Sequence, residues 1–272
     1  MRFEIIQPSA NLASIVKYYW VIEKSTLEPD VCERVIPTGS IQLMFHYKTP
    51  FVVFGADNTC TNQARSLVSG LAQTYADVAA VDCSGVLAVT FHPWGACQIL
   101  PFSLAELEDT NIRLQDVFGT VITILENQLN KATCTLQRVR LIEKFLMNNL
   151  IGSKPQDVNF VKQSLTHILQ AQGRLTTYDL ENKLSMSGRN LERKFAALVG
   201  KTPKQYSKII RFQSVVRELA KNTSVEWAQL AYAYGFADQS HLIKEFKSIS
   251  GLTPVLYKSL CCNNSTLLDS AD

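Results

Sequence analysis

The spacing of apolar residues changes once along the chain, close to residue 105. Before that point, short apolar runs such as residues 40–47, 51–54 and 85–91 are separated by turn residues, which is typical of β-strands. From Leu104 onward, apolar positions recur every three to four residues, as on one face of a helix. The pattern predicts a β-rich segment followed by helices.

A break in the helical pattern divides the chain in two. Residues 106–150 are predicted to form a helical pair that closes the first domain, and residues 151–155 include Gly152 and Pro155, which disfavour a helix interior. The boundaries expected from this reading are a first domain over 1–150, a linker over 151–155, a helical domain over 156–260 and a disordered tail over 261–272.

Charge separates the same two regions. The 272 residues include 27 Lys and Arg against 24 Asp and Glu, but residues 153–260 hold 16 basic and 8 acidic residues, which leaves 11 and 16 elsewhere. The positive potential is therefore confined to the helical domain, which suits a polyanion partner for that domain alone.

Cysteine usage and hydropathy bear on the compartment. The seven cysteines form no C-x-x-C pair, and no run of 18 apolar residues occurs. Reduced thiols in a cytoplasmic protein without a membrane span are the expectation.

The helical domain contains an internal repeat. Six identities share an offset of 51 residues, and they follow the spacing Phe-x4-Gly-x-Thr-Pro-x-x-Tyr. The pairs are Leu191 and Leu242, Phe195 and Phe246, Gly200 and Gly251, Thr202 and Thr253, Pro203 and Pro254, and Tyr206 and Tyr257. A helix that ends at Gly, followed by a Thr-Pro helix start, explains this spacing. Two copies predict two similar helical units.

Each copy is preceded by a short helix and a turn. In the first copy, residues 180–184 form the short helix and Ser187 is placed to cap a helix that runs to about Val199. In the second, residues 228–234 precede Gly235, and Asp238 caps a helix that runs to about Ser250. Both copies are predicted to be helix-turn-helix units.

The start of each capped helix carries polar side chains of the kinds that contact DNA. The candidate DNA-binding residues are Ser187, Arg189, Asn190, Arg193 and Lys194 in the first copy, and Asp238, Gln239, Ser240, His241 and Lys244 in the second. Arg suits guanine, and Asn or Gln suits adenine. Two such helices on one face would enter successive major grooves roughly 34 Å apart. The alternative is that these polar side chains only form a solvated, charged helix face.

At these residues the sequence resembles the AraC/XylS family of bacterial regulators. The most telling stretch runs from Ala231 through Gly235-Phe236-Ala237-Asp238-Gln239-Ser240-His241 to Tyr257, and Leu242 and Lys244 stand where Phe and Arg are usual. The resemblance covers about 100 residues. It implies a sequence-specific transcription regulator that binds double-stranded DNA, with a small-molecule effector, RNA polymerase and a second copy of the chain as further partners. Whether transcription is activated or repressed is not encoded.

The β-rich half is similar to the cupin-like sensor domains attached to such units. The fold class expected is thus a β-rich barrel or sandwich plus helices, joined to an all-α domain. Trp20 and Trp94 are candidate ligand contacts, with core aromatics as the alternative. The four His residues form no cluster, so neither a metal nor another cofactor is expected. Two alternatives remain open: a cupin-like metal-dependent enzyme with an accessory helical domain, and a ligand-independent regulator whose first domain serves only assembly.

Overall fold

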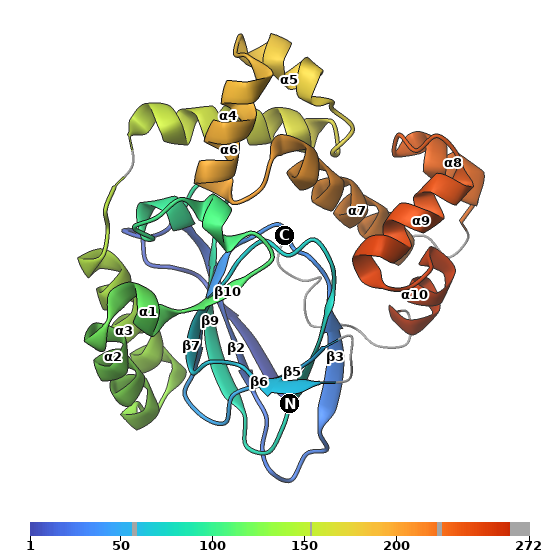
Figure 1. Cartoon of the computed structure of the whole chain (residues 1–272). Helices are drawn as coiled ribbons and strands as arrows, with labels where there is room; N and C mark the ends of the chain where they lie inside the picture. The colour runs from blue at the N-terminus through green and yellow to red at the C-terminus, as the bar shows by residue number, and fades with distance from the viewer. Residues whose placement is uncertain (56–58, 153, 222–224, 262–272) are drawn as a thin grey trace.

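A computed structural model describes residues 1–55, 59–152, 154–221 and 225–261. A β-domain carries three helices on one side and the remaining helices above it and to the right in the view of Figure 1. Within the described ranges, none of the helices is both long and apolar enough to cross a membrane.

Two antiparallel sheets form the β-domain. The larger sheet has the strand order β1-β2-β9-β4-β7-β10, and the smaller has the order β3-β8-β5-β6. The strands are β1 Arg2–Ile6, β2 Val16–Glu23, β3 Val31–Val35, β4 Gln42–His46, β5 Val52–Phe54, β6 Cys60–Asn62, β7 Ser66–Ser69, β8 Ala76–Ala80, β9 Gly85–Phe91 and β10 Asn111–Arg113.

The larger sheet is covered on both faces, which explains its apolar central strands. Side chains such as Tyr19 and Leu43 on one face pack in a core with the helices, whereas Trp20 and Met44 on the other face belong to a smaller cluster with Phe51 near the second sheet. Strand β9 is buried at every position. A strand buried on both faces is a continuous apolar run, as in residues 85–91.

Helices fill the rest of the first region and the whole of the second. The first region has η1 Ala96–Gln98, η2 Leu104–Leu107, α1 Leu114–Phe118, α2 Thr120–Lys131 and α3 Thr135–Asn148. The helical domain has α4 Pro155–Gln170, α5 Thr177–Leu184, α6 Gly188–Val199, α7 Pro203–Lys221, α8 Trp227–Ala233, α9 Gln239–Ser250 and α10 Pro254–Cys261. Helix α7 connects the α5–α6 pair to the α8–α9 pair (Figure 1).

The predicted fold class is confirmed, with corrections at the boundaries. The β-region continues to Arg113 because β10 pairs with β7, although residues 106–150 were expected to be helical. Pro155, expected in the linker, is the first residue of α4. Helix α10 extends to Cys261, and residues 262–272, where a tail was predicted, lie outside the described residues.

The buried side chains of the helical domain belong to two separate clusters. The largest cluster joins the β-domain, α1–α3 and α4–α6 in one core, and it includes Leu191, Phe195 and Tyr206. A second cluster contains Phe212, Phe246 and their neighbours in α7–α10. Helix α7 contributes its beginning to one cluster and its remainder to the other.

Candidate nucleic-acid interface and adjoining cavity

Helix α6 presents a basic face at its first turns. Ser185 takes a left-handed conformation with φ 49°, which turns the chain from α5 into α6. Ser187 occupies the N-cap position without a side-chain cap bond, and it is exposed. Arg189, Asn190 and Arg193 are exposed on the helix. The Arg193 Nη2 group donates to Asn190 Oδ1 at 3.1 Å, so these two side chains lie together on this surface.

Helix α9 has the predicted cap and a milder polar face. The Asp238 carboxylate accepts a hydrogen bond from the His241 backbone N–H at 2.7 Å, and Gly235 takes a left-handed turn with φ 75°. Gln239, Ser240 and Lys244 are exposed. The His241 ring lies edge-on to Phe236 and accepts from the Ala237 backbone N–H at 3.3 Å, which orients it on the exposed face.

Lys194 and Asp238, both predicted to bind DNA, have structural roles in the helical domain. Lys194 is half-buried, its ammonium lies 2.9 Å from Asp157, and it sits over the Phe160 ring, so it connects α6 to α4. Asp238 serves as the cap of α9. Of the DNA-binding residues chosen from the sequence, Lys194 alone is not exposed.

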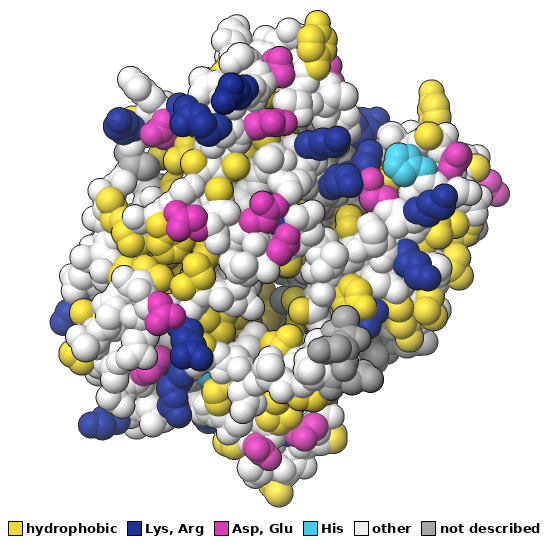
Figure 2. All heavy atoms as spheres, viewed as in Figure 1, with side chains coloured by type: hydrophobic (Ala, Val, Ile, Leu, Met, Phe, Trp, Pro, Cys, Tyr) yellow, Lys and Arg dark blue, Asp and Glu magenta, His cyan; other side chains and the backbone are white. Residues whose placement is uncertain are grey.

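Many Lys and Arg side chains lie on the surface of the helical domain. In Figure 2, Lys and Arg are spread over the upper and right-hand part of the molecule, where α4–α9 lie, with acidic side chains between them. Arg211 on α7 pairs with the carboxylate of Glu245 on α9 and stacks over Phe236. These contacts fix α9 against α7.

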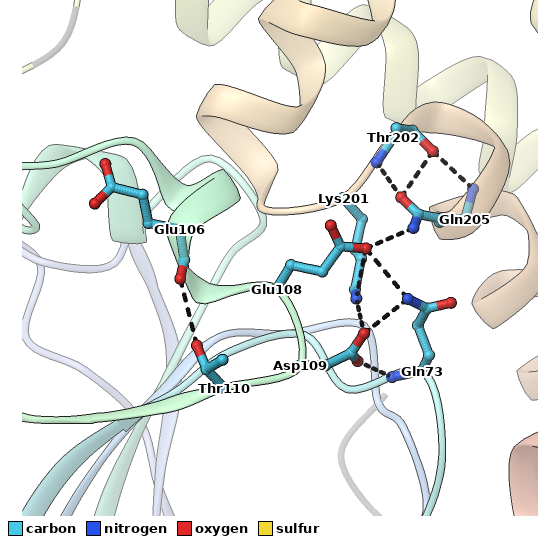
Figure 3. Close-up of polar contacts among 8 residues, drawn as sticks. All are labelled: Gln73, Glu106, Glu108, Asp109, Thr110, Lys201, Thr202 and Gln205. Atoms are coloured by element: carbon cyan, nitrogen blue, oxygen red, sulfur yellow. Dashed lines mark hydrogen bonds and ion pairs between the residues drawn. The ribbon is translucent and has the colours of Figure 1, made fainter.

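The turn after α6 is docked on the β-domain by a buried lysine (Figure 3). Lys201 has no exposed side-chain surface, and its Nζ lies 3.2 Å from Glu108 Oε1 and 3.0 Å from Asp109 Oδ2. Gln205 donates to Glu108, and Gln73 donates to Asp109 at 2.7 Å. Because a buried cation is costly without partners, the two carboxylates hold this turn in place.

The equivalent turn after α9 is docked by different residues. The Tyr75 backbone N–H donates to the Ile249 carbonyl at 2.8 Å, and Arg34 Nη1 donates to the Ser250 carbonyl at 3.4 Å. Arg34 stacks over the Tyr75 ring at 3.9 Å. A Cβ at Gly251 would lie 2.4 Å from that ring, so only glycine permits this approach.

A cavity of about 620 Å³ lies inside the β-domain beside both docking sites. Segments 36–40 and 69–76 are part of its wall. Segment 36–40 contacts α7, because Tyr206 donates its hydroxyl to the Gly39 carbonyl at 3.3 Å and the Gln213 amide donates to the Pro37 carbonyl. Segment 69–76 carries Gln73 and Tyr75, which contact Asp109 and the turn after α9. The wall of the cavity and the docking surface are thus built from the same two segments.

The two tryptophans chosen from the sequence have different surroundings. Trp20 is buried and lines the cavity. Trp94, the other candidate ligand contact, does not line this cavity. Its indole N–H donates to the Ser14 carbonyl at 2.8 Å, its ring stacks on His92, and Lys162 of α4 lies over it. Trp94 belongs to the interface between the β-domain and α4.

Several residues of the docking sites were missed by the sequence reading. Lys201 and Glu108 are 93 positions apart, and Arg34 and Ser250 are 216 apart. No local pattern pairs residues at such distances. Among the residues that the structure describes, no three His, Cys, Asp or Glu side chains are grouped as a metal site requires.

Two family models match separate parts of the chain. Residues 180–259 match a family model described as "Helix-turn-helix domain", and residues 4–113 match one described as "Domain of unknown function (DUF6597)". No curated protein matches the chain.

Solved structures give further similarities. The chain is similar to ToxT from Vibrio cholerae, with 13% identity over 89% of this chain and 97% of that chain and a TM-score of 0.45. It is also similar to an AraC-type regulator from Chromobacterium violaceum, with 22% identity over 39% and 95% and a TM-score of 0.35. The DNA-binding domain of AdpA in complex with a target DNA matches with 21% identity over 39% and 96% and a TM-score of 0.35.

A β-rich domain joined to two repeated helix-turn-helix units defines a DNA-binding transcription regulator. The family match places a helix-turn-helix domain over residues 180–259, and the motifs around Asp238 resemble those of the AraC/XylS family.

Proposed function

We propose that the chain reads a promoter through the first turns of α6 and α9, and that a small molecule in the β-domain cavity controls this reading. The observation that carries the first part is the pair of exposed polar faces on the two repeated helices, each of which packs its Leu and Phe side chains into a core. Recognition helices use this arrangement to place polar side chains against base edges.

The two helices differ in the contacts they offer. Arg189 and Arg193 can each present a guanidinium fork to guanine, and Asn190 can read adenine. On α9, Gln239 suits adenine, whereas the ammonium of Lys244 is a point charge that suits phosphate. We therefore assign most of the base discrimination to α6, and mainly positioning on the backbone to α9.

Effector control is supported by the shared wall of the cavity. Gln73 borders the cavity and also donates to Asp109, which holds Lys201, while Tyr75 borders the cavity and holds the turn after α9. A ligand that moves segment 69–76 changes both docking sites at once. The size of the effect on DNA binding is set by the difference in the ligand's affinity for the protein before and after segment 69–76 moves.

A second copy of the chain is the further partner proposed. Helices α2 and α3 leave an apolar groove of about 200 Å³ lined by residues such as Val121, Ile124 and Leu141. The Val121 and Ile124 side chains are more than half exposed. A symmetric contact through this groove would bury them.

The test uses the full-length protein and duplexes selected from a random pool. Anisotropy titrations at several salt concentrations should show log affinity falling linearly with log salt, because Lys and Arg displace counterions from the phosphates. A scrambled duplex of the same composition is the control. Equal affinity for both duplexes, or no dependence on salt, would contradict the proposal. Sedimentation of the wild type and of Ile124→Glu tests whether two copies associate through the α2–α3 groove. A variant that sediments like the wild type would contradict this contact.

A further inference from the structure

The cavity has an unusual charge composition. Among its described lining residues, the only acidic side chains are those of Glu33 and Asp109, and neither Lys nor Arg is present. Met1 borders the cavity, but its amino group is paired with Glu28. Most of the remaining wall is apolar, with Met44 and Phe51 as examples. A bound anion would therefore meet carboxylates and no free cation.

One polar group of the cavity has an unused hydrogen bond. The Trp20 side chain is 6% exposed, and its Nε1–H has no partner among the described residues. A buried donor without an acceptor costs free energy. Trp20 belongs to β2 of the larger sheet, on the face that forms the smaller cluster with Met44 and Phe51. The donor is thus placed for an acceptor on a bound molecule.

The Glu33 carboxyl faces the cavity from the opposite sheet. Its neighbour Arg34 pairs with Asp77 and stacks on Tyr75, and successive residues of β3 point to opposite faces. Within the described part of the chain, the Glu33 carboxyl takes part in neither an ion pair nor a side-chain hydrogen bond, while its backbone pairs with Val78 of β8. Burial raises the pKa of this carboxyl. Asp109, by contrast, is already held by Lys201 and Gln73.

From these observations we infer that the cavity takes an apolar molecule that carries a protonated amine and a hydrogen-bond acceptor. The amine pairs with Glu33, the acceptor receives the Trp20 Nε1–H, and the apolar body packs against Met44 and Phe51. The volume of about 620 Å³ lies within the usual range for small-molecule sites. This inference rests on the proposed function, because it names the chemical class of the effector in that same cavity.

Matched probes with one skeleton test the charge preference. Calorimetric titrations of the full-length protein would use 4-phenylbutylamine, 4-phenylbutanol and 4-phenylbutyrate, which differ in the head group alone. We expect the amine to bind at least tenfold more tightly than the alcohol, and the acid to bind most weakly. Binding of the acid as tight as that of the amine, or binding of none of the three, overturns the inference.

Two variants, of which Glu33→Gln is isosteric and Trp20→Phe removes the indole N–H while keeping an aromatic ring, locate the groups responsible. Glu33→Gln should reduce the affinity for the amine to that for the alcohol and leave the alcohol within about twofold. Trp20→Phe should weaken a probe with an acceptor, 4-methoxyphenethylamine, more than phenethylamine. The control is Glu106→Gln, which removes one carboxylate from an exposed side chain that points away from the docking cluster in Figure 3. A Glu33→Gln variant that folds, by circular dichroism, and keeps the amine preference overturns the inference.

Parallel anisotropy titrations on the selected duplex separate this inference from the proposed function. Amine binding without a change in DNA affinity supports the ligand class and contradicts effector control. Specific DNA binding together with no amine binding leaves the DNA-binding proposal standing and overturns the ligand class.

Discussion

The two helix-turn-helix units share a repeated frame but differ in how they are attached to the β-domain. The first unit, α5 and α6, contributes Leu191 and Phe195 to the core that runs through the β-domain. The second unit, α8–α10, has a core of its own around Phe246. It reaches the β-domain mainly through Arg34, Tyr75 and partly buried Ile36.

This difference indicates which unit can move. Displacing the first unit would open a continuous apolar core, whereas displacing the second would break a few hydrogen bonds and a ring contact. Hydrophobic burial provides most of the stability of a fold, and exposed polar contacts provide little. A signal from the cavity should therefore loosen the attachment of the second unit to the β-domain more readily than that of the first.

The largest expected effect compares two equivalent core positions. Phe195→Ala and Phe246→Ala each remove a buried ring at a cost of about 3–5 kcal/mol. Phe195→Ala should lower the stability of the β-domain and the first unit together, because they share a core. Phe246→Ala should loosen the second unit alone. Hydrogen exchange read separately in β9 and α10 distinguishes the two, and equal loss of protection in both segments for both variants would contradict separate cores.

Acid should destabilise the core that the β-domain shares with the first unit more than the core of the second unit, because His46 is buried in the β-domain. Burial lowers the pKa of His46 to about 4, and its Nε2 lies 3.0 Å from Gln63 Oε1. The unfolded chain takes up this proton near pH 6.5, so the stability of the folded state falls as the pH drops from about 6.5 to about 4. The total loss is about 3 kcal/mol at 1.36 kcal/mol per pH unit.

Denaturant unfolding measured across this pH range checks the prediction. His46→Gln should flatten the dependence in the β-domain and the first unit. A wild type whose second unit loses the same amount would show that the two cores unfold as one. An unchanged slope in the variant would show that another group titrates.

Substitutions on the exposed faces of α6 and α9 should affect DNA binding differently: one should lower base preference, and the other should lower affinity for all duplexes. Arg189→Ala is expected to relax the preference at one base position by about 1–3 kcal/mol, because a bidentate contact to guanine is removed. Lys244→Ala should weaken all duplexes alike and reduce the salt slope by about 1. Selection from random duplexes with each variant measures both, with exposed Lys183→Ala on α5 as the control. If Lys244→Ala instead loses preference at one base position, the assignment of base discrimination to α6 and of backbone positioning to α9 is wrong.

The smallest effects concern the two docking sites. Lys201→Met should cost about 1–2 kcal/mol of global stability, since its two carboxylate partners are 43% and 44% exposed and partly solvated. Arg34→Met should change global stability by less than about 1 kcal/mol and speed exchange in α9 and α10. The control for Lys201→Met is Lys204→Met, which replaces an exposed lysine. A larger loss for Arg34→Met than for Lys201→Met would reverse the proposed difference in attachment.

Local signals explain which parts of the fold could be predicted. The left-handed Gly235, the Asp238 cap and Gly251 act within a few residues, so the bounds of α8 and α9 agree with the sequence to within a residue or two. Strands β4 and β9 are continuous apolar runs because they are buried on both faces. Edge strands such as β6 and β10 are short and mostly exposed, and their sequences give no such signal.

The adjoining cavity could be predicted only in part. An aromatic residue in an apolar strand made Trp20 a candidate, and the structure places it in the wall. Trp94 was a candidate at a strand-to-helix turn, but its location depends on packing against α4, which the sequence does not specify. Glu33 was not selected, because alternation along a strand becomes informative only when the partner sheet is known.

The continuity of α7 has a consequence for the architecture of the operator. This helix has 19 residues and a length of about 28 Å, and it spans the distance between the two reading units. A rigid rod of that length matches one turn of duplex and cannot stretch to two. One chain should therefore require adjoining half-sites in a fixed phase. Five inserted base pairs would place the second half-site on the opposite side of the duplex, and ten would restore the phase but exceed the reach of the rod.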